Sequence, residues 1–168
     1  YNKGVRYYYL CNIDNFGALF SYETMALLAL SGAQGAFDFS FKTKTDFKGG
    51  VLIEDKQGKF NCVDIGVAIS AEELERKSNS GQAVLFNCAT GLFDLKYILD
   101  NYEMIVNSLP VRVSIQDKDV GKYRQLEQVT WEVIGIMDNP MFMAVDKYQR
   151  FISAKTYTEL LLSSGIKI

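Results

Sequence analysis

The segment 37–42 constrains the fold of this chain more than any other. It reads Phe-Asp-Phe-Ser-Phe-Lys, so an aromatic ring recurs at every second position. Because successive side chains of a β-strand point to opposite faces, this alternation predicts a strand with three rings on one face and polar groups on the other. We expect the rings to face a core, and the polar side, with Ser40 and Lys42, to face solvent.

Other stretches carry the same period, or runs of β-branched and aromatic residues, and these patterns are typical of strands. The expected strands lie at 5–11, 51–53, 60–65, 83–86, 111–115, 129–137 and 141–145, with a hairpin turn over 55–58. The strongest β region after residue 121 is 129–137, which contains the lone tryptophan, Trp131.

Four segments are predicted to be helical, namely 21–30, 70–81, 92–109 and 154–162. A serine stands at the start of three of them, where its side chain can cap the first turn: Ser21, Ser70 and Ser153. The segment 92–109 has apolar residues every three to four positions and is ended by Pro110.

Together these patterns predict an α+β fold of mostly antiparallel strands, with three or four helices packed on them. The chain has 168 residues, of which 48% are hydrophobic and 23% charged, as in an ordinary folded domain. We find no repeat, linker or low-complexity tract, so residues 1–168 are expected to form a single α+β domain. A chain of this length buries about 68–70% of its unfolded surface and needs neither disulfides nor a metal for stability.

Charge argues against two classes of partner. Lys and Arg number 18 against 20 Asp and Glu, giving a net charge of −2, whereas nucleic-acid and anionic-membrane binding depend on clustered cations. The densest basic stretch, 42–48, is interpreted as a solvated edge strand guarded by lysines.

Because no apolar run approaches the ~20 residues of a membrane span and no secretory leader is seen, we expect no membrane segment in this chain. It begins at Tyr1, which suggests a missing short piece or an excised part of something longer.

The residues that usually carry catalysis are scarce. The chain has no histidine, which removes the commonest general base and the commonest metal ligand. Its three cysteines, Cys11, Cys62 and Cys88, form no metal-binding spacing and are interpreted as reduced, buried thiols of a protein made in a reducing cytoplasm. Ser–Lys pairs, paired carboxylates and the Gly-x-x-Gly at 32–35 all have structural interpretations.

We therefore expect no catalytic, cofactor-binding or metal-binding residue, no cofactor, and no enzymatic activity. A histidine-independent enzyme or small-ligand binder stays as a third hypothesis. A deep polar pocket holding a carboxylate with a strongly raised pKa would favour it.

Two clusters of large side chains are candidate partner interfaces. Tyr7, Tyr8 and Tyr9 are consecutive in a strand, so they point to both faces and at least one ring is expected to face outward. Met141, Phe142 and Met143 lie beside a turn, and soft, large side chains suit a packed interface. For the stretch with Met141, Phe142 and Met143, an ordinary strand is the alternative. We expect protein partners, with a homo-oligomer or ring as the form, and no nucleic acid.

The segment 123–138 resembles the sheet segment of small phage head–tail connector (neck) proteins. In both, a polar stretch leads into a Trp-x-Val strand and an acidic turn, here through Trp131, Val133 and Asp138. The resemblance covers only about 25 residues and implies a ring-forming virion component without catalysis, located in the virion and in the host cytoplasm during assembly.

Residues 131–136, followed by 151–160, also resemble the end of the extracytoplasmic domain of FtsX-like or MacB-like transporter permeases. That resemblance implies a sensing or partner-binding domain outside the cytoplasm. The leading hypothesis is thus a non-enzymatic structural protein, most plausibly a head–tail connector, with the permease domain of an ABC transporter as the alternative.

Overall fold

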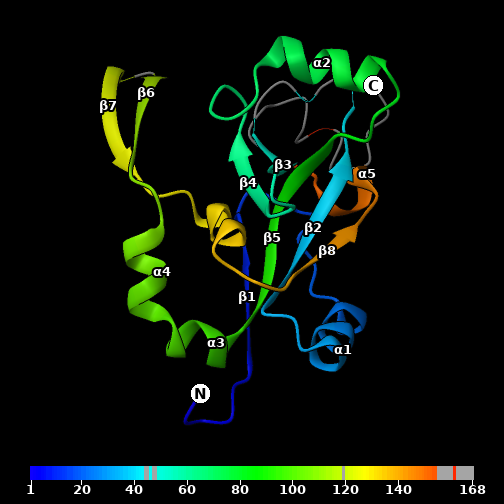
Figure 1. The fold of residues 1–168 in the computed structure, drawn as a ribbon, viewed down its shortest axis with the longest axis vertical. Coiled ribbons are helices and arrows are strands. Elements are labelled where there is room, and N and C mark those ends of the chain that lie inside the picture. Colours follow the sequence, from blue (N-terminus) through cyan, green and yellow to red (C-terminus); the bar gives the residue numbers. More distant parts are fainter. Residues whose placement is uncertain (44–45, 47–48, 119, 155–160, 162–168) are drawn as a thin grey trace.

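The computed structural model describes the chain except for residues 44–45, 47–48, 119, 155–160 and 162–168 (Figure 1). Its elements, in chain order, are β1 (Tyr7–Cys11), α1 (Tyr22–Ser31), β2 (Gly35–Phe41), β3 (Gly50–Glu54), β4 (Phe60–Asp64), α2 (Ala71–Asn79), β5 (Leu85–Asp94), α3 (Leu95–Asp100), α4 (Tyr102–Ser108), β6 (Arg112–Lys118), β7 (Gly121–Glu127), the 3₁₀ helix η1 (Thr130–Gly135), β8 (Pro140–Ala144) and α5 (Lys147–Arg150). The α+β class predicted from the sequence is confirmed.

A six-stranded sheet forms the centre, with its strands in the order β4-β3-β5-β2-β8 and β1 paired to β5 (Figure 1). The ten-residue strand β5 is its axis, since β2 pairs along it on one side while β1 and β3 share the other. All of these pairs are antiparallel except β2 with β8, which is parallel. The expectation of mostly antiparallel strands therefore holds.

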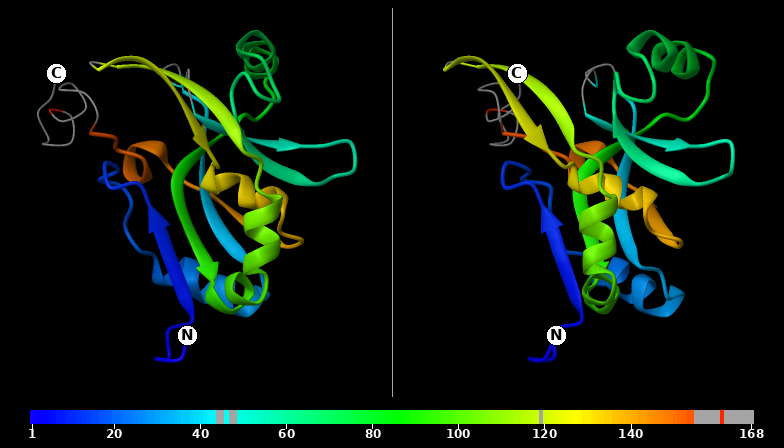
Figure 2. Two further views of the ribbon diagram at one scale, coloured as in Figure 1. Left: turned by 90° about the vertical axis from the view of Figure 1, so that its left-hand side faces the viewer. Right: turned by 60° about the vertical axis from the view of Figure 1, so that its left-hand side comes forward.

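Helical elements cover both faces of the sheet (Figure 2). On the face of η1 and α4, Phe37, Phe39, Phe93 and Ile134 belong to the largest apolar cluster. On the opposite face Leu28 of α1 packs with residues of β2 and β5, and α2 contributes Leu74 to a third cluster with β3 and β5.

The strand expected at residues 37–42 is present as β2, but its polar side is not at the surface. Phe37 and Phe39 are fully buried and Phe41 is 58% exposed. Asp38 and Ser40 are buried as well, because α1 and α5 cover the side that the sequence pattern assigns to solvent. The strand is therefore central, with both faces covered.

Two predicted helix boundaries are confirmed. Ser21 caps α1 by accepting a hydrogen bond from the Thr24 N–H at 3.0 Å, and Gly32 ends the helix with a left-handed φ of 65°. Ser70 caps α2 in the same way, accepting from the Glu73 N–H at 3.1 Å. The last predicted helix, 154–162, falls almost entirely outside the described residues.

The helix predicted over 92–109 begins later and is broken. β5 continues to Asp94, whose side chain accepts hydrogen bonds from the N–H groups of Lys96 and Tyr97 and so starts α3. The helix is interrupted at Asn101, and α4 follows. Leu92, counted in the helical pattern, is instead a buried strand residue.

The prediction of a strand at 129–137 is wrong, because residues 130–135 form the 3₁₀ helix η1. Val133, Ile134 and Met137 all enter the main apolar cluster there, which the spacing of a helical turn allows. Trp131 packs partly buried against the same cluster, with its ring 6.5 Å from that of Phe37. The strand on which both family resemblances depend is therefore absent.

The strands β6 and β7 form a separate two-stranded hairpin that projects from the body (Figures 1 and 2). Val113, Ile115 and Leu126 on this hairpin are all more than 60% exposed.

The lysine-guarded solvated strand expected at 42–48 is contradicted at its first residue. Lys42 has a 7% exposed side chain that pairs with Glu75 at 2.7 Å. Among the described residues, none of the helices has the length and apolarity to cross a membrane.

Candidate functional site

An irregularity in β5 marks the site. Phe37 of β2 pairs with Gly91, but Phe39, two residues later, pairs with Asn87, so β5 carries two extra residues over this interval. Ala89 within it has φ 53°, in the left-handed region that a non-glycine residue occupies at a cost of about 1–3 kcal/mol. Such bulges re-aim side chains and are common next to active sites.

The residue at the foot of this bulge, Asn87, has an unsatisfied amide. Its Oδ1 accepts a hydrogen bond from the Ala89 N–H at 2.6 Å, while its buried Nδ2 has no partner among the described residues. An unpaired buried donor costs about 1–3 kcal/mol, so it is retained where it serves a purpose, such as binding a ligand. As the partner of Phe39 in the pairing register, Asn87 lies on the η1 face of the sheet.

Two further residues from neighbouring strands come together with Asn87. A Cβ atom on Gly50 would lie 3.6 Å from the Cβ of Asn87 and 3.7 Å from Oδ1 of Asp64, and 2.8 Å from the Sγ of Cys62. Gly50 therefore allows the Cys62 sulfur to approach the backbone of β3 closely, and it places the end of β4 beside the bulge. Asp64 is the last residue of β4 and stands opposite Gly50 in the register.

The electrostatics single out Asp64. The pKa of its carboxyl group is raised because neighbouring protein removes part of its hydration, and because Glu127 and Glu132 add negative charge, which Arg112 partly offsets. Burial raises the pKa of the adjacent Cys62 thiol to about 12, so this cysteine is not a nucleophile. A perturbed carboxyl group of this kind is a mark of functional sites.

This arrangement suits a neutral ligand rich in hydroxyl groups. Carboxylates accept hydrogen bonds from hydroxyls, and the free Asn87 amide can donate one in return. The carboxyl groups of Asp64, Glu127 and Glu132 lie near the single guanidinium group of Arg112. This excess of negative charge repels a phosphate group. Among the described residues, no group of three or more His, Cys, Asp or Glu is arranged to hold a metal ion.

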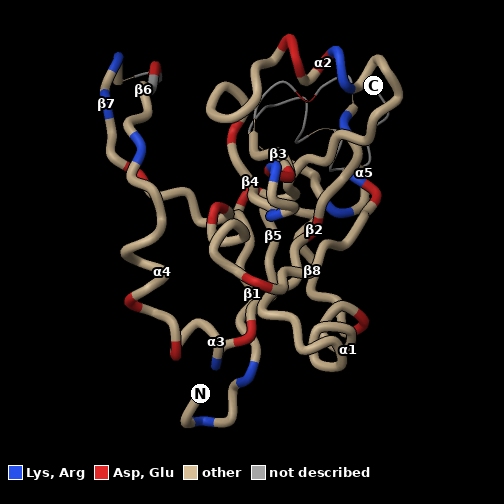
Figure 3. Tube along the Cα trace, viewed as in Figure 1, with Lys and Arg blue, Asp and Glu red and all other residues tan. Residues whose placement is uncertain are grey.

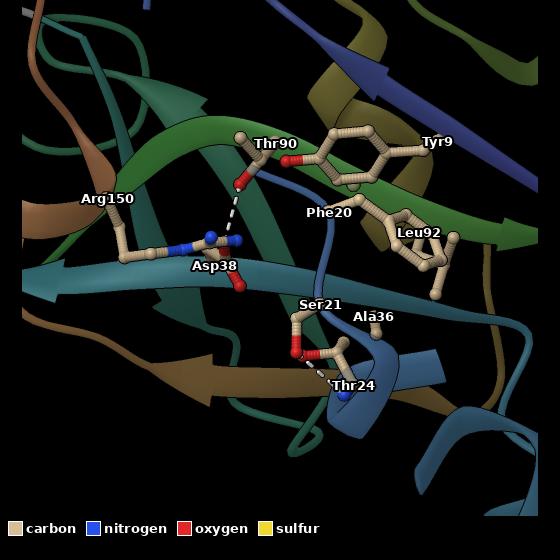
Figure 4. Close-up of a pocket in the computed structure, with 10 residues that line it drawn as sticks. Tyr9, Phe20, Ser21, Thr24, Ala36, Asp38, Thr90, Leu92 and Arg150 are labelled. Carbon is tan, nitrogen blue, oxygen red and sulfur yellow. Dashed lines mark hydrogen bonds and ion pairs between the residues drawn. The ribbon is translucent and has the colours of Figure 1, made fainter. Parts of the chain in front are cut away.

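A second hollow, on the opposite face, is filled by its own side chains (Figure 4). It has a volume of about 10 Å³, room for roughly one water. Arg150 Nη2 lies 2.7 Å from Oδ2 of buried Asp38, and the Thr90 hydroxyl donates to the same oxygen at 2.9 Å. Tyr9 completes the wall, with a pKa that burial raises. These contacts join β1, β2, β5 and the end of α5, which is a structural role.

Asn15, in the loop after β1, ties the same region together. It is 5% exposed and makes four hydrogen bonds. Its Nδ2 donates to the carbonyls of Cys88 at 3.1 Å and Arg150 at 3.0 Å, and its Oδ1 accepts from the N–H groups of Gly17 and Ile152 at 3.0 and 2.9 Å. The loop, the bulge and the chain after α5 are therefore held as one unit.

The sequence-predicted interface residues have mixed exposure. Tyr8 is 51% exposed, whereas Tyr7 and Tyr9 pack partly buried against the α1 side of the core. In β8, Phe142 stacks edge-on against Phe39 and Phe60, Met141 joins the α1-side cluster, and Met143 is half-buried. Their role as a partner interface stays a prediction.

The sequence reasoning missed the three residues that define the candidate site: Gly50, Asp64 and Asn87. A signal existed, since Asn87 is a polar residue next to a predicted buried strand and Gly50 opens a predicted hairpin. All three cysteines are free, and Cys62 and Cys88 are buried as expected.

Comparison with solved structures defines the class of fold. Residues of this chain superpose on a UDP-glucose phosphorylase from Trypanosoma brucei with a TM-score of 0.77 and 22% identity, covering 95% of this chain and 37% of that one. A UDP-glucose pyrophosphorylase mutant from Leishmania major in complex with UDP-Glc gives a TM-score of 0.74 at 20% identity, with the same coverage. The chain thus shares the fold of a part of these two proteins.

Sequence comparison identifies the family. The sequence model of the UDPGP family, described as UTP--glucose-1-phosphate uridylyltransferase, matches residues 1–166, and the chain belongs to this family. A probable UTP--glucose-1-phosphate uridylyltransferase from Schizosaccharomyces pombe is 27% identical over 95% of the chain, and UTP--glucose-1-phosphate uridylyltransferase 2 from Dictyostelium discoideum is 25% identical over 96%. The chain spans about a third of the length of either relative.

These findings overturn several expectations from the sequence. The chain belongs to a family of metabolic enzymes, so neither the head–tail connector nor the permease domain is its family, and the non-enzymatic assignment is wrong. A virion or extracytoplasmic location loses its support with them. The physical reason is that Trp131 lies in η1, whereas both resemblances require a strand there.

Proposed function

We propose that this chain forms the sugar-binding part of a UTP–glucose-1-phosphate uridylyltransferase. The observation that carries the proposal is the family match over residues 1–166. The site at Asn87 and Asp64 supports it, because a buried amide donor and a carboxylate acceptor suit the hydroxyl groups of a hexose.

In the reaction named for the family, a phosphate oxygen of glucose 1-phosphate attacks the α-phosphorus of UTP. A new P–O bond forms, the bond to the β-phosphate oxygen breaks, and pyrophosphate leaves with the electron pair of that bond, giving UDP-glucose. Because both reactants are anions, catalysis of such a transfer depends on positioning and on charge compensation more than on covalent chemistry.

Each residue of the site has a defined task in this proposal. Asp64 accepts hydrogen bonds from the sugar hydroxyls, and Asn87 Nδ2 donates one. The surrounding carboxylates favour the neutral ring over the phosphates, so the ring is expected here and the phosphates beyond it. A site of this type gains specificity from hydroxyl hydrogen bonds, since an unpaired buried donor penalises ligands that lack them.

The test is a titration of the chain with UDP-glucose, glucose 1-phosphate and glucose, followed by calorimetry and by NMR of the Asn87 side-chain amide. We expect saturable binding of UDP-glucose and a shift of that amide signal. Asn87→Leu, which keeps the size of the side chain and removes the donor, is expected to weaken binding about tenfold. Asn79→Leu, at an exposed position of α2, is the matched control and should bind as the unmodified chain does. Absence of saturable binding of all three ligands, or equal affinities of the two variants, would contradict the proposal.

A further inference from the structure

The foot of the β6–β7 hairpin is held to the body by an ion pair. Arg112, the first residue of β6, places Nε 2.5 Å from Oε1 of Glu132 and Nη2 2.8 Å from Oε2. The Glu132 side chain is 2% exposed and that of Arg112 is 32% exposed. A bidentate pair of this kind fixes orientation as well as distance.

Few other contacts determine how the hairpin sits. Gln128, just after β7, donates to the carbonyl oxygens of Val106 at 3.2 Å and Leu109 at 2.9 Å, at the end of α4. Beyond its foot the hairpin pairs only with itself among the described residues, and it extends away from the sheet (Figure 1). The Arg112–Glu132 pair is therefore the main side-chain link between the hairpin and η1.

The same pair lies next to the candidate site, because β4, which ends at Asp64, packs against η1, which carries Glu132. Asp64 responds to Glu127 at the end of β7, to Glu132 of η1 and to Arg112 of β6. Arg112 and Glu127 face each other in the hairpin register, and Gln125 holds Oε2 of Glu127 at 2.9 Å. Basic and acidic positions both occur along the hairpin, including at its tip (Figure 3). Among the described residues that act on Asp64, Arg112 supplies the one positive charge.

We propose that Arg112 is a positioning residue for the sugar site, whose pair with Glu132 fixes the foot of the hairpin near Asp64 and supplies the positive charge that the carboxylates there share. Arg112 does not touch the ligand in this proposal but acts through Glu132 and Asp64. The inference rests on the proposed function, because it takes Asp64 as the acceptor of the sugar hydroxyls.

The experiment compares Arg112→Gln, Arg112→Lys, Glu132→Gln and the double variant Arg112→Gln/Glu132→Gln. The control is Lys122→Gln, which removes a cation from the far end of the same hairpin, where Lys122 lies 3.7 Å from Asp117. UDP-glucose affinity is measured against pH. Because the ionised carboxylate accepts the hydroxyl hydrogen bonds, affinity should rise with pH through the titration of Asp64.

Arg112→Gln is expected to weaken UDP-glucose binding about tenfold near neutral pH and to move the midpoint of the profile to higher pH, since the cation that favours ionised Asp64 is lost. Arg112→Lys should restore the midpoint but not the affinity, because an ammonium group cannot form the bidentate fork. The double variant should return the midpoint toward that of the unmodified chain, since it removes one positive and one negative charge, while its affinity stays low. Lys122→Gln should change neither quantity.

The experiment separates loss of folding from loss of affinity, and failure of this inference from failure of the proposed function. Arg112→Gln leaves a buried carboxylate unpaired and can unfold the chain, whereas the double variant removes both charges and still reports on affinity. A ligand-free NMR titration of the Asp64 carboxyl carbon tests the charge effect even if UDP-glucose does not bind, so failure of the proposed function is recognised separately. If the folded variants match Lys122→Gln in both the Asp64 titration and UDP-glucose affinity, the inference is overturned.

Discussion

At the scale of single residues, β5 contains two features that each lower the stability of the fold, and they lie two residues apart. Asn87 leaves a buried donor unpaired, and Ala89 adopts a left-handed backbone conformation two residues later. Neither contributes to stability, and each costs about 1–3 kcal/mol. A ligand that accepts a hydrogen bond from Asn87 would recover the first cost.

Asp64 gives a prediction about stability and pH. Its pKa is raised in the folded state, so the folded chain holds the proton more tightly than the unfolded chain does. The stability this provides is fully present below the unfolded pKa of about 3.9 and is lost as pH rises through the folded value. Asp64→Asn is therefore expected to be more stable than the unmodified chain at pH 7, with the difference shrinking toward pH 4.

Urea denaturation at both pH values measures this effect. Asp55→Asn serves as a control at a turn carboxylate that accepts two backbone N–H bonds, from Gln57 at 2.8 Å and Lys59 at 2.9 Å, and it should be destabilising instead. A lower stability of Asp64→Asn at pH 7 would show that its ionised form is favoured by folding. The same variant should bind UDP-glucose less tightly, so stability and binding are expected to change in opposite directions.

At the scale of elements, the Asn15 side chain holds together three segments: the loop after β1, the bulge of β5 and the chain after α5. Asn15→Ala removes four hydrogen bonds at a buried position and should lower the free energy of unfolding by about 3 kcal/mol or more. Hydrogen exchange is expected to rise at the N–H groups of Gly17 and Ile152 before it rises in the central sheet.

Asn15→Asp separates the two halves of this contact. The carboxylate keeps the acceptor for Gly17 and Ile152 but faces the carbonyl oxygens of Cys88 and Arg150 without a donor. It should therefore preserve the exchange protection of those two N–H groups and still destabilise the chain. Unchanged stability in both variants would contradict the role assigned to Asn15.

Elements with strong local signals were predictable from the sequence, and those set by tertiary contacts were not. The caps at Ser21 and Ser70 and the turn at 55–58 depend on residues next to them in sequence. Residues 130–135 form η1 in spite of their β-type composition, because Ile134 is buried in the main cluster and Glu132 meets Arg112 from twenty residues earlier.

The candidate site could not be predicted from the sequence either, because it too depends on tertiary contacts. Gly50, Asp64 and Asn87 come from three strands, and only the pairing register and the two-residue shift in β5 bring them together. The absence of histidine argues against catalytic sets that depend on that residue, but it does not exclude a transferase that works by positioning its reactants. Of the three hypotheses, the third, a histidine-independent enzyme or small-ligand binder, is the one compatible with the family that the comparisons identify.

At the scale of the whole molecule, two apolar surfaces lie open. On α1, Leu27 is 47% exposed and Leu30 86%, and on the hairpin Ile115 and Leu126 are 70% and 73% exposed. A two-stranded hairpin is marginally stable in water on its own. The chain spans about a third of the length of its curated relatives.

Such surfaces predict association of the isolated chain. We expect sedimentation velocity to show concentration-dependent oligomers, in line with the homo-oligomer expected from the sequence, because exposed apolar patches and unpaired strand edges associate readily. Ile115→Thr with Leu126→Thr should reduce that association while leaving the thermal midpoint nearly unchanged, since neither side chain packs against the core. Val51→Thr, at the buried position of β3, is the contrasting control and should lower the midpoint. A chain that stays monomeric at every concentration would mean that the hairpin is stable and soluble without a covering surface, and the exposure of Ile115 and Leu126 would then carry no consequence for assembly.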